Sequence, residues 1–133
     1  MLKKIHIARH HGFCMGVKRA IQIAEETSDK AGERVTILNE IVHNDAVVEK
    51  FRSRGVGQAF GVDQVDEGTL IISAHGVAPA VKAAARARGL NVVDATCPLV
   101  ERIYIIIDKI VQNGYYVIHW GEKDHDETHG VVG

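Results

Sequence analysis

The clearest strand–helix unit of the chain is NVVDATCPLVERIYIIIDKIVQ, residues 91–112. Its first four residues, 91–94, are apolar at their centre and predict a short buried strand. Ala95 and Thr96 separate this strand from Cys97. A long helix then begins at Pro98, in the first turn where a helix tolerates proline, and ends before Gly114. The unit therefore predicts a strand, a short loop that carries a thiol, and a helix.

The same order recurs along the chain on both sides of this unit. Residues 16–30, for example, place apolar side chains at the i, i+3, i+4 and i+7 spacing of an amphipathic helix. We expect strands over 2–8, 35–38, 69–73, 91–94 and 115–120, and helices over 16–30, 45–54, 79–88 and 98–112. Strands that alternate with helices predict an α/β fold of repeated βα units with a mainly parallel sheet.

The sequence also predicts one irregular region and a division into domains. The Gly- and Asp-rich region 56–68 predicts irregular structure with a short edge strand. Residues 1–95, including the loop of Cys14, are expected to form a first α/β domain, and residues 96–133 to begin a second one.

Side chains capable of chemistry follow the predicted strands. In a parallel sheet these loops share the carboxyl edge, where open α/β folds bind their ligands. The functional loops are therefore expected at the carboxyl ends of the strands, with thiols, imidazoles and a carboxylate converging on one rim. The candidates are Cys14, His43, His75, Cys97, His125 and Glu127.

Each candidate also has a plainer interpretation. A free cysteine is often an inert buried side chain, whereas a thiolate at a helix N-terminus is stabilised by the helix dipole. A loop histidine or a lone glutamate is commonly a solvated surface residue. The Cys and His spacing is compatible with zinc or with an iron–sulfur cluster and does not choose between them.

Composition excludes several classes of function. The chain has 133 residues, 16 Lys+Arg against 17 Asp+Glu, and 5% aromatic residues, which argues against a nucleic-acid binder. No apolar run approaches the ~20 residues of a membrane span, and no signal peptide is recognisable. We therefore expect a cytoplasmic protein without a membrane partner, in which Cys14 and Cys97 form no disulfide.

Four segments resemble the IspH/LytB family, whose members are 4-hydroxy-3-methylbut-2-enyl diphosphate reductases. They are GFCMGVKRA at 12–20, EIVHN at 40–44, SAHGV at 73–77 and DATCPLV at 94–100. The resemblance covers essentially the whole chain and about the N-terminal half of a typical member.

The resemblance implies an oxidoreductase of the non-mevalonate isoprenoid pathway, which reduces this substrate to isopentenyl and dimethylallyl diphosphate. It implies a 4Fe–4S cluster held by three cysteines, of which Cys14 and Cys97 match the first two. His43, His75 and His125 match residues that bind the substrate diphosphate, and Glu127 matches the proton donor. In KDHDE at 123–127, an Asp replaces the family's usual Pro.

The chain contains only two cysteines, so it lacks the third cluster ligand. It is then a fragment of a longer enzyme, a chain completed by a partner, or a relic without a cluster. We expect the chain to be inactive alone. We expect it either to lack the C-terminal half of the enzyme or to form a dimer. The resemblance implies that the complete enzyme uses a small ferredoxin or flavodoxin as electron donor. The alternatives are a diphosphate- or anion-binding module without a cluster, and a zinc site of Cys14, Cys97 and one histidine.

Overall fold

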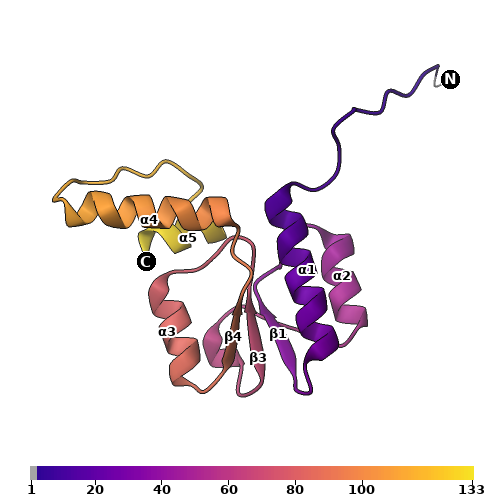
Figure 1. The fold of residues 1–133 in the computed structure, drawn as a ribbon, viewed down its shortest axis with the longest axis horizontal. Coiled ribbons are helices and arrows are strands. Elements are labelled where there is room, and N and C mark those ends of the chain that lie inside the picture. Colours follow the sequence, from indigo (N-terminus) through magenta and orange to yellow (C-terminus); the bar gives the residue numbers. More distant parts are fainter. Residues whose placement is uncertain (1–2) are drawn as a thin grey trace.

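The computed structural model describes residues 3–133, which contain one four-stranded sheet with helices on both faces (Figure 1). All strand pairs are parallel, and the strand order is β2-β1-β3-β4. The α/β fold with a parallel sheet is therefore confirmed. The elements are α1 (Met15–Lys30), β1 (Val35–Leu38), α2 (Asp45–Ser53), β2 (Gly57–Ala59), η1 (Val62–Gln64), β3 (Thr69–Ile72), α3 (Pro79–Ala87), β4 (Asn91–Asp94), α4 (Pro98–Gln112) and α5 (Asp126–Val132).

The two faces of the sheet carry separate apolar clusters. On one face, side chains of β1 and β3 pack against α1 and α2, with Phe51 of α2 almost fully buried. On the other face, Leu70 and Ile72 of β3 pack against α3 and the loop around Val65. Because both faces are covered, every residue of β1 and β3 is buried, which explains their continuous apolar sequences.

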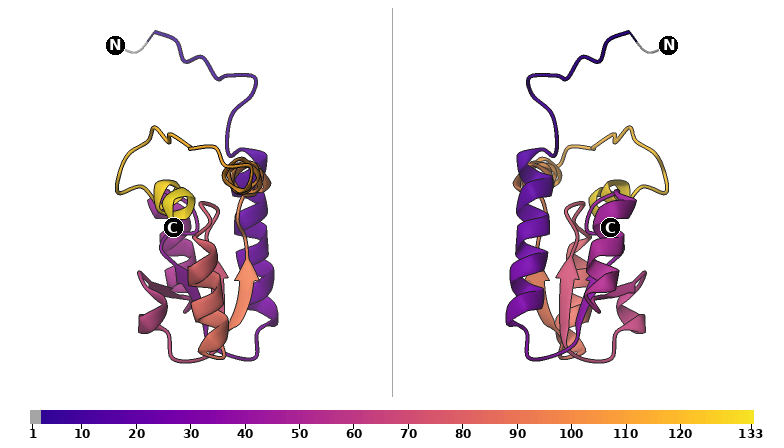
Figure 2. Two further views of the ribbon diagram at one scale, coloured as in Figure 1. Left: turned by 90° about the vertical axis from the view of Figure 1, so that its left-hand side faces the viewer. Right: turned by 90° about the vertical axis from the view of Figure 1, so that its right-hand side faces the viewer.

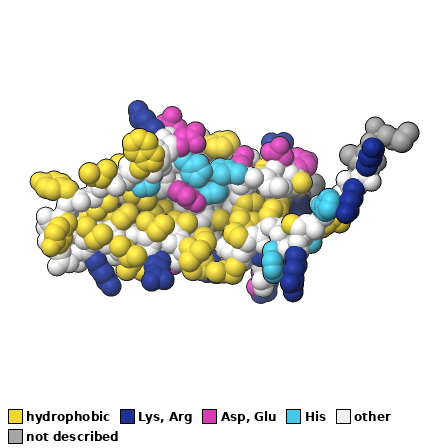
Figure 3. Space-filling view, turned by 90° about the horizontal axis from the view of Figure 1, so that it is seen from above, with side chains coloured by type: hydrophobic (Ala, Val, Ile, Leu, Met, Phe, Trp, Pro, Cys, Tyr) yellow, Lys and Arg dark blue, Asp and Glu magenta, His cyan; other side chains and the backbone are white. Residues whose placement is uncertain are grey.

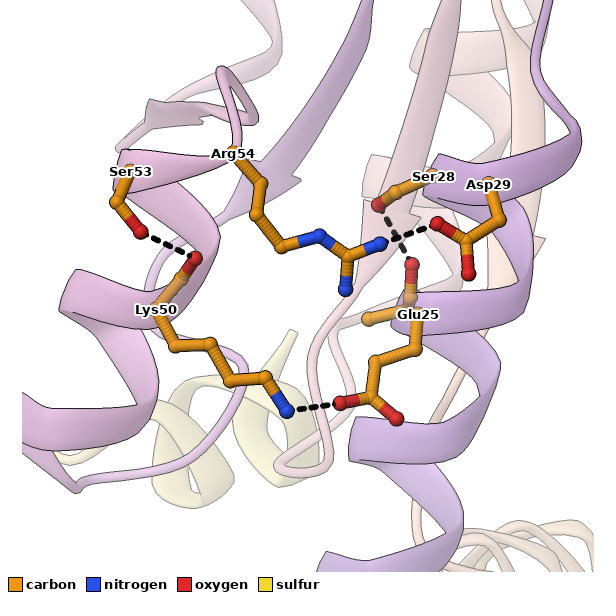
Figure 4. Close-up of polar contacts among 7 residues, drawn as sticks. Glu25, Ser28, Asp29, Lys50, Ser53 and Arg54 are labelled. Atoms are coloured by element: carbon orange, nitrogen blue, oxygen red, sulfur yellow. Dashed lines mark hydrogen bonds and ion pairs between the residues drawn. The ribbon is translucent and has the colours of Figure 1, made fainter.

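The helices of the first face are also joined at their surface (Figure 4). Lys50 and Arg54, at the C-terminal end of α2, pair with Glu25 and Asp29 of α1. Exposed ion pairs of this kind each contribute roughly 0–1 kcal/mol to stability. The buried apolar contacts therefore determine how α1 and α2 pack, and the ion pairs add little.

The strand order creates a reversal between β1 and β3. The chain leaves β1 toward α2 on one face of the sheet, and it leaves the neighbouring β3 toward α3 on the other face. The two loops therefore diverge at the carboxyl edge of the sheet. Open α/β sheets bind ligands at such a point.

Helix α4 lies across the carboxyl edge of the sheet, and α5 runs beside it (Figures 1 and 2). None of the α4 residues is buried, although the helix contains five isoleucines. The chain thus changes direction after β4 and extends away from the α/β body. The expected division into domains at residue 95 remains a prediction.

Two of the expected strands are wrong. Residues 3–8 form no strand but a segment that extends away from the body (Figure 1), and residues 115–120 are not a strand either. Both have apolar side chains that are largely exposed, such as Ile7 and Trp120. Within residues 3–133 neither segment has a neighbouring strand to pair its backbone groups, and an unpaired strand is not stable. Leu2, where the first of these strands was expected to begin, lies outside the described residues.

The other expected elements occur close to their predicted bounds. The region 56–68 contains the short strand β2 at one edge of the sheet, as its sequence indicated. The helix expected at 98–112 ends at Gln112, and Gly114 just beyond it has a φ of 80°, the left-handed conformation that glycine adopts easily. Across residues 3–133, no helix combines the length and the apolar character needed to cross a membrane.

Candidate functional site

The loops that follow β1 and β3 bring two histidines into direct contact. His43 lies in the loop after β1 and His75 in the loop after β3. Their rings stack with centroids 4.1 Å apart and an interplanar angle of 25°. Glu40 fixes the first ring, since its Oε2 lies 3.0 Å from Nδ1 of His43. Two residues that are far apart in the sequence thus form one site through the reversal of strand order.

A third histidine reaches this pair from the far end of the chain. His125 immediately precedes α5, and its ring lies edge-on to those of His43 and His75, at 5.2 and 5.7 Å between centroids. One ring nitrogen of each histidine lies within 4.8 Å of one from each of the others. Seen from above the carboxyl edge, histidine and acidic side chains gather near the middle of the molecule (Figure 3).

His75 is the most enclosed member of this cluster. Its side chain is only 12% exposed, and its Nε2 is buried without a hydrogen-bond partner in the described chain. Burial, followed by the neighbouring His43, lowers the pKa of His75, while Asp126 and Glu127 act in the opposite direction. Oε1 of Glu127 lies 3.6 Å from Nδ1 of His75, so the carboxylate faces the cluster.

Tyr104 of α4 contacts the backbone on both sides of the histidine cluster, in the His75 loop and in α5. Its hydroxyl donates a hydrogen bond to the backbone oxygen of His75, at 3.1 Å. The side chain also fills the space beside Gly76 and Gly130, where an added Cβ would overlap the tyrosine ring or hydroxyl. Burial, with Glu127 and Asp94 nearby, raises the pKa of Tyr104 to about 12. Tyr104 therefore stays neutral and connects α4, the His75 loop and α5.

The two cysteines occupy equivalent positions at the starts of helices. Cys14 is the N-cap of α1 and Cys97 the N-cap of α4, and both thiols are free. The Sγ of Cys97 lies against Gly16, in the first turn of α1, so closely that a Cβ there would overlap it. Arg19 strengthens the contact by donating to the backbone oxygen of Thr96, at 3.0 Å. The start of α1, where Cys14 lies, is therefore next to Cys97.

The structure thus places His43, His75, His125 and Glu127 together, and Cys14 and Cys97 at two adjoining helix starts. Cys14 follows no strand, contrary to expectation, because residues 3–14 form neither a strand nor a helix. His125 likewise follows no strand and reaches the cluster as the residue before α5.

Sequence analysis overlooked three residues that shape the site: Glu40, Tyr104 and Gly16. A signal existed for one of them. Tyr104 is the one hydroxyl-bearing residue in the apolar run 103–107, and a partly buried tyrosine usually needs a hydrogen-bond partner. The contact of Gly16 with Cys97 has no local signal, because it joins residues 81 positions apart (97 − 16).

Comparison with known proteins shows which family the sequence and the fold are similar to. Residues 5–133 match the family model described as LytB protein. The chain is 43% identical over 134 residues to the 4-hydroxy-3-methylbut-2-enyl diphosphate reductase of Ralstonia nicotianae, covering 98% of this chain and 40% of that protein. It is 40% identical over 129 residues to the reductase of Aquifex aeolicus, covering 97% and 45%.

Two solved structures are similar to the fold. A structure of (E)-4-hydroxy-3-methyl-but-2-enyl diphosphate reductase, described as the terminal enzyme of the non-mevalonate pathway, superposes with a TM-score of 0.83 at 40% identity, covering 96% of this chain and 46% of that one. The reductase structure from Plasmodium falciparum gives a TM-score of 0.88 at 35% identity, covering 92% and 39%. The chain thus spans less than half the length of these relatives.

Proposed function

The chain belongs to the LytB protein family, and from this we propose that it supplies part of a 4-hydroxy-3-methylbut-2-enyl diphosphate reductase. The observation that carries the proposal is the gathering of His43, His75 and His125 at the strand reversal. It occurs in a chain that is 40% or more identical to two proteins of that name.

In this proposal the three imidazoles bind the substrate diphosphate. A ring N–H donates a hydrogen bond to a phosphate oxygen, and a protonated ring adds charge attraction. Glu40 supports the role of His43, because an Nδ1–H that donates to the carboxylate keeps the ring oriented. The exposure of the His43 side chain, 49%, leaves the site accessible to an anion from solvent.

Glu127 is proposed as the proton donor. Its carboxyl group lies beside His75, 3.6 Å from the ring, and half of its side chain is exposed. The reaction reduces the allylic alcohol with two electrons and two protons and releases the hydroxyl as water. A carboxyl group at the edge of the diphosphate site is in position to supply a proton to that hydroxyl. We propose that the electrons come from a small ferredoxin or flavodoxin.

Cys14 and Cys97 are proposed as two ligands of a 4Fe–4S cluster. The donor set fits in part: both thiols are free, and the missing Cβ of Gly16 leaves room for Cys97 Sγ beside the start of α1. Helix N-termini stabilise thiolates, the form that binds iron. When bound, such a cluster supplies electrons and an iron that polarises the substrate hydroxyl. A third thiolate has to come from outside these 133 residues, which contain two cysteines.

The proposal is tested by titrating the chain with inorganic diphosphate in a calorimeter. We expect binding, and a roughly 10-fold or greater loss of affinity in His43→Ala, since a hydrogen bond to a charged group contributes about 1.5–3 kcal/mol. His10→Ala, in the exposed N-terminal segment, is the matched control and should bind like the parent chain. An affinity unchanged in His43→Ala would contradict the proposal.

Anaerobic quantification of iron and sulfide tests the cysteines separately. We expect iron and sulfide uptake that falls in Cys14→Ser and Cys97→Ser, together with negligible reductase activity of the chain alone. Histidine-dependent diphosphate binding without any iron uptake would favour the alternative, an anion-binding module without a cluster. The electron donor, a dimeric state and a cytoplasmic location remain predictions.

A further inference from the structure

We propose that His43, His75 and His125 also form a binding site for one divalent transition-metal ion that prefers imidazole, such as Zn²⁺ or Co²⁺. The first observation is the spacing of their ring nitrogens, which lie within 4.8 Å of one another. A tetrahedral zinc ion with Zn–N bonds of about 2.0–2.1 Å holds its nitrogens roughly 3.4 Å apart. Small rotations of the rings therefore bring all three onto one ion.

The second observation is that a carboxylate faces the Nδ1 side of two rings. Nδ1 of His43 lies at hydrogen-bond distance, 3.0 Å, from Oε2 of Glu40, and Nδ1 of His75 lies at ion-pair distance, 3.6 Å, from Oε1 of Glu127. An Nδ1–H that donates to a carboxylate leaves the lone pair on Nε2, and this carboxylate–histidine arrangement is the usual support of a metal-binding histidine. Nε2 of His75 is buried and has no hydrogen-bond partner in residues 3–133. A bound ion would satisfy it.

The third ligand requires one local change. Nδ1 of His125 accepts a hydrogen bond from the backbone N–H of Glu127 at 3.3 Å, which places the ring proton on Nε2. Coordination through Nε2 moves that proton to Nδ1 and ends this hydrogen bond. Because a contact of 3.3 Å is long for a hydrogen bond, the loss is small compared with a metal–nitrogen bond.

This inference does not depend on the proposed function, but it has a consequence for it. An anion binds to ring N–H groups, whereas a metal ion binds to ring lone pairs. The same nitrogens cannot offer both at once. A bound ion and a directly bound diphosphate are therefore alternative occupants of the cluster.

The test is a titration of metal-free chain with Co²⁺, followed by visible absorption, and with Zn²⁺, followed by calorimetry. We expect one equivalent to bind, without the thiolate-to-cobalt charge-transfer absorption that a cysteine ligand produces. The double variant Cys14→Ser, Cys97→Ser should bind as tightly as the parent chain. Loss of binding in that variant would overturn the histidine site in favour of a site that uses the thiols.

Histidine variants supply the decisive comparison. We expect His43→Ala and His125→Ala to weaken Zn²⁺ binding at least 10-fold, and Glu40→Gln to weaken it about 10-fold through the orientation of His43. His10→Ala and His119→Ala, whose rings lie outside the cluster, should leave the affinity unchanged. Circular dichroism verifies that each variant folds. A Zn²⁺ affinity unchanged in His43→Ala would overturn the proposal.

A separate titration of the metal-free chain with inorganic diphosphate distinguishes the two claims. Diphosphate binding without Zn²⁺ binding would overturn the metal site and leave the proposed function intact. Zn²⁺ binding without diphosphate binding would support the metal site and contradict the anion role of the histidines.

Discussion

Gly16 shows how a missing side chain can shape a site. It lies in the first turn of α1, and Cys97 Sγ occupies the space that a Cβ would need. In most helices alanine is more favourable than glycine by roughly 0.5–1 kcal/mol. Here the thiol reverses this preference, because the start of α1 can approach α4 only while position 16 has no side chain.

Gly16→Ala is therefore expected to destabilise the chain, by about 1–3 kcal/mol, the usual cost of overpacking. Urea unfolding measures the difference. Gly32→Ala is the matched control, because no atom lies within 4 Å of an added Cβ there and its φ is not positive. The control should leave stability unchanged or raise it slightly. A Gly16→Ala chain as stable as the Gly32→Ala chain would contradict the packing argument.

Asp94, at the end of β4, makes the other notable interaction at the scale of single residues. Burial by itself would raise its pKa, but hydrogen bonds from Lys82 and Thr96 outweigh burial and lower the pKa below the ordinary value of 3.8. The folded chain thus binds this proton less readily than the unfolded chain does. The stabilisation is fully present above the unfolded pKa and is lost as the pH falls through the lowered, folded pKa.

Asp94→Asn should cost about 1–2 kcal/mol at pH 7, where the parent carboxylate is charged. The difference between parent and variant should shrink as the pH falls from 3.8 toward the lowered, folded pKa, because the unfolded parent chain then takes up a proton that the folded chain resists. Asp66→Asn, a change at a side chain that is 94% exposed, is the control and should have little effect. An equal difference at pH 7 and pH 3 would exclude a charge-dependent role.

At the scale of elements, the start of α2 links helix formation to the site. Asn44 is the N-cap, and its side-chain oxygen accepts a hydrogen bond from the backbone N–H of Val47 at 3.1 Å. This satisfies one of the N–H groups that a helix start leaves unpaired. Because His43 directly precedes the cap, the same turn positions its ring against those of His75 and His125.

Asn44→Ala should lower the free energy of unfolding by about 1 kcal/mol, the typical contribution of a side-chain cap. It should also weaken diphosphate binding, since His43 loses its fixed position. Asn44→Asp keeps a capping oxygen and should restore stability. Urea unfolding measures the stability of each variant, and calorimetry measures diphosphate binding. If Asn44→Asp destabilises the chain as much as Asn44→Ala does, capping is not the cause.

At the scale of the whole molecule, a large apolar surface has no cover in the described chain. It consists of one side of α4 and the segment 115–120, where Tyr116 is 99% exposed and Trp120 is 97% exposed. Hydrophobic side chains dominate this end of the molecule in the view from above (Figure 3). Apolar patches of this kind on soluble proteins usually mark interaction surfaces.

The chain on its own is therefore expected to self-associate as its concentration rises, which sedimentation velocity measures. Ile105→Gln, on the exposed side of α4, should shift the chain toward the monomer. Arg102→Gln introduces the same side chain at another exposed position of the helix and should not. A parent chain that stays monomeric at all concentrations would refute the expectation.

The sequence by itself determined the local elements and the chemistry available. Apolar spacing, Pro98 and the glycines at helix ends predicted most helix and strand bounds, because these signals act over a few neighbouring residues. The same signals failed at 3–8 and 115–120, where a strand needs a pairing partner that the local pattern cannot supply. The histidines and cysteines were recognisable as candidates because they follow predicted strands or precede predicted helices. This signal, too, is local in the sequence.

Only the tertiary structure decided which candidates meet. The reversal between β1 and β3 stacks His43 on His75, and α5 then brings His125 to the pair. Strand order and the face that each helix covers depend on packing between distant segments, which no local pattern encodes. For the same reason, the contact of Gly16 with Cys97 and the support from Tyr104 became visible only in three dimensions.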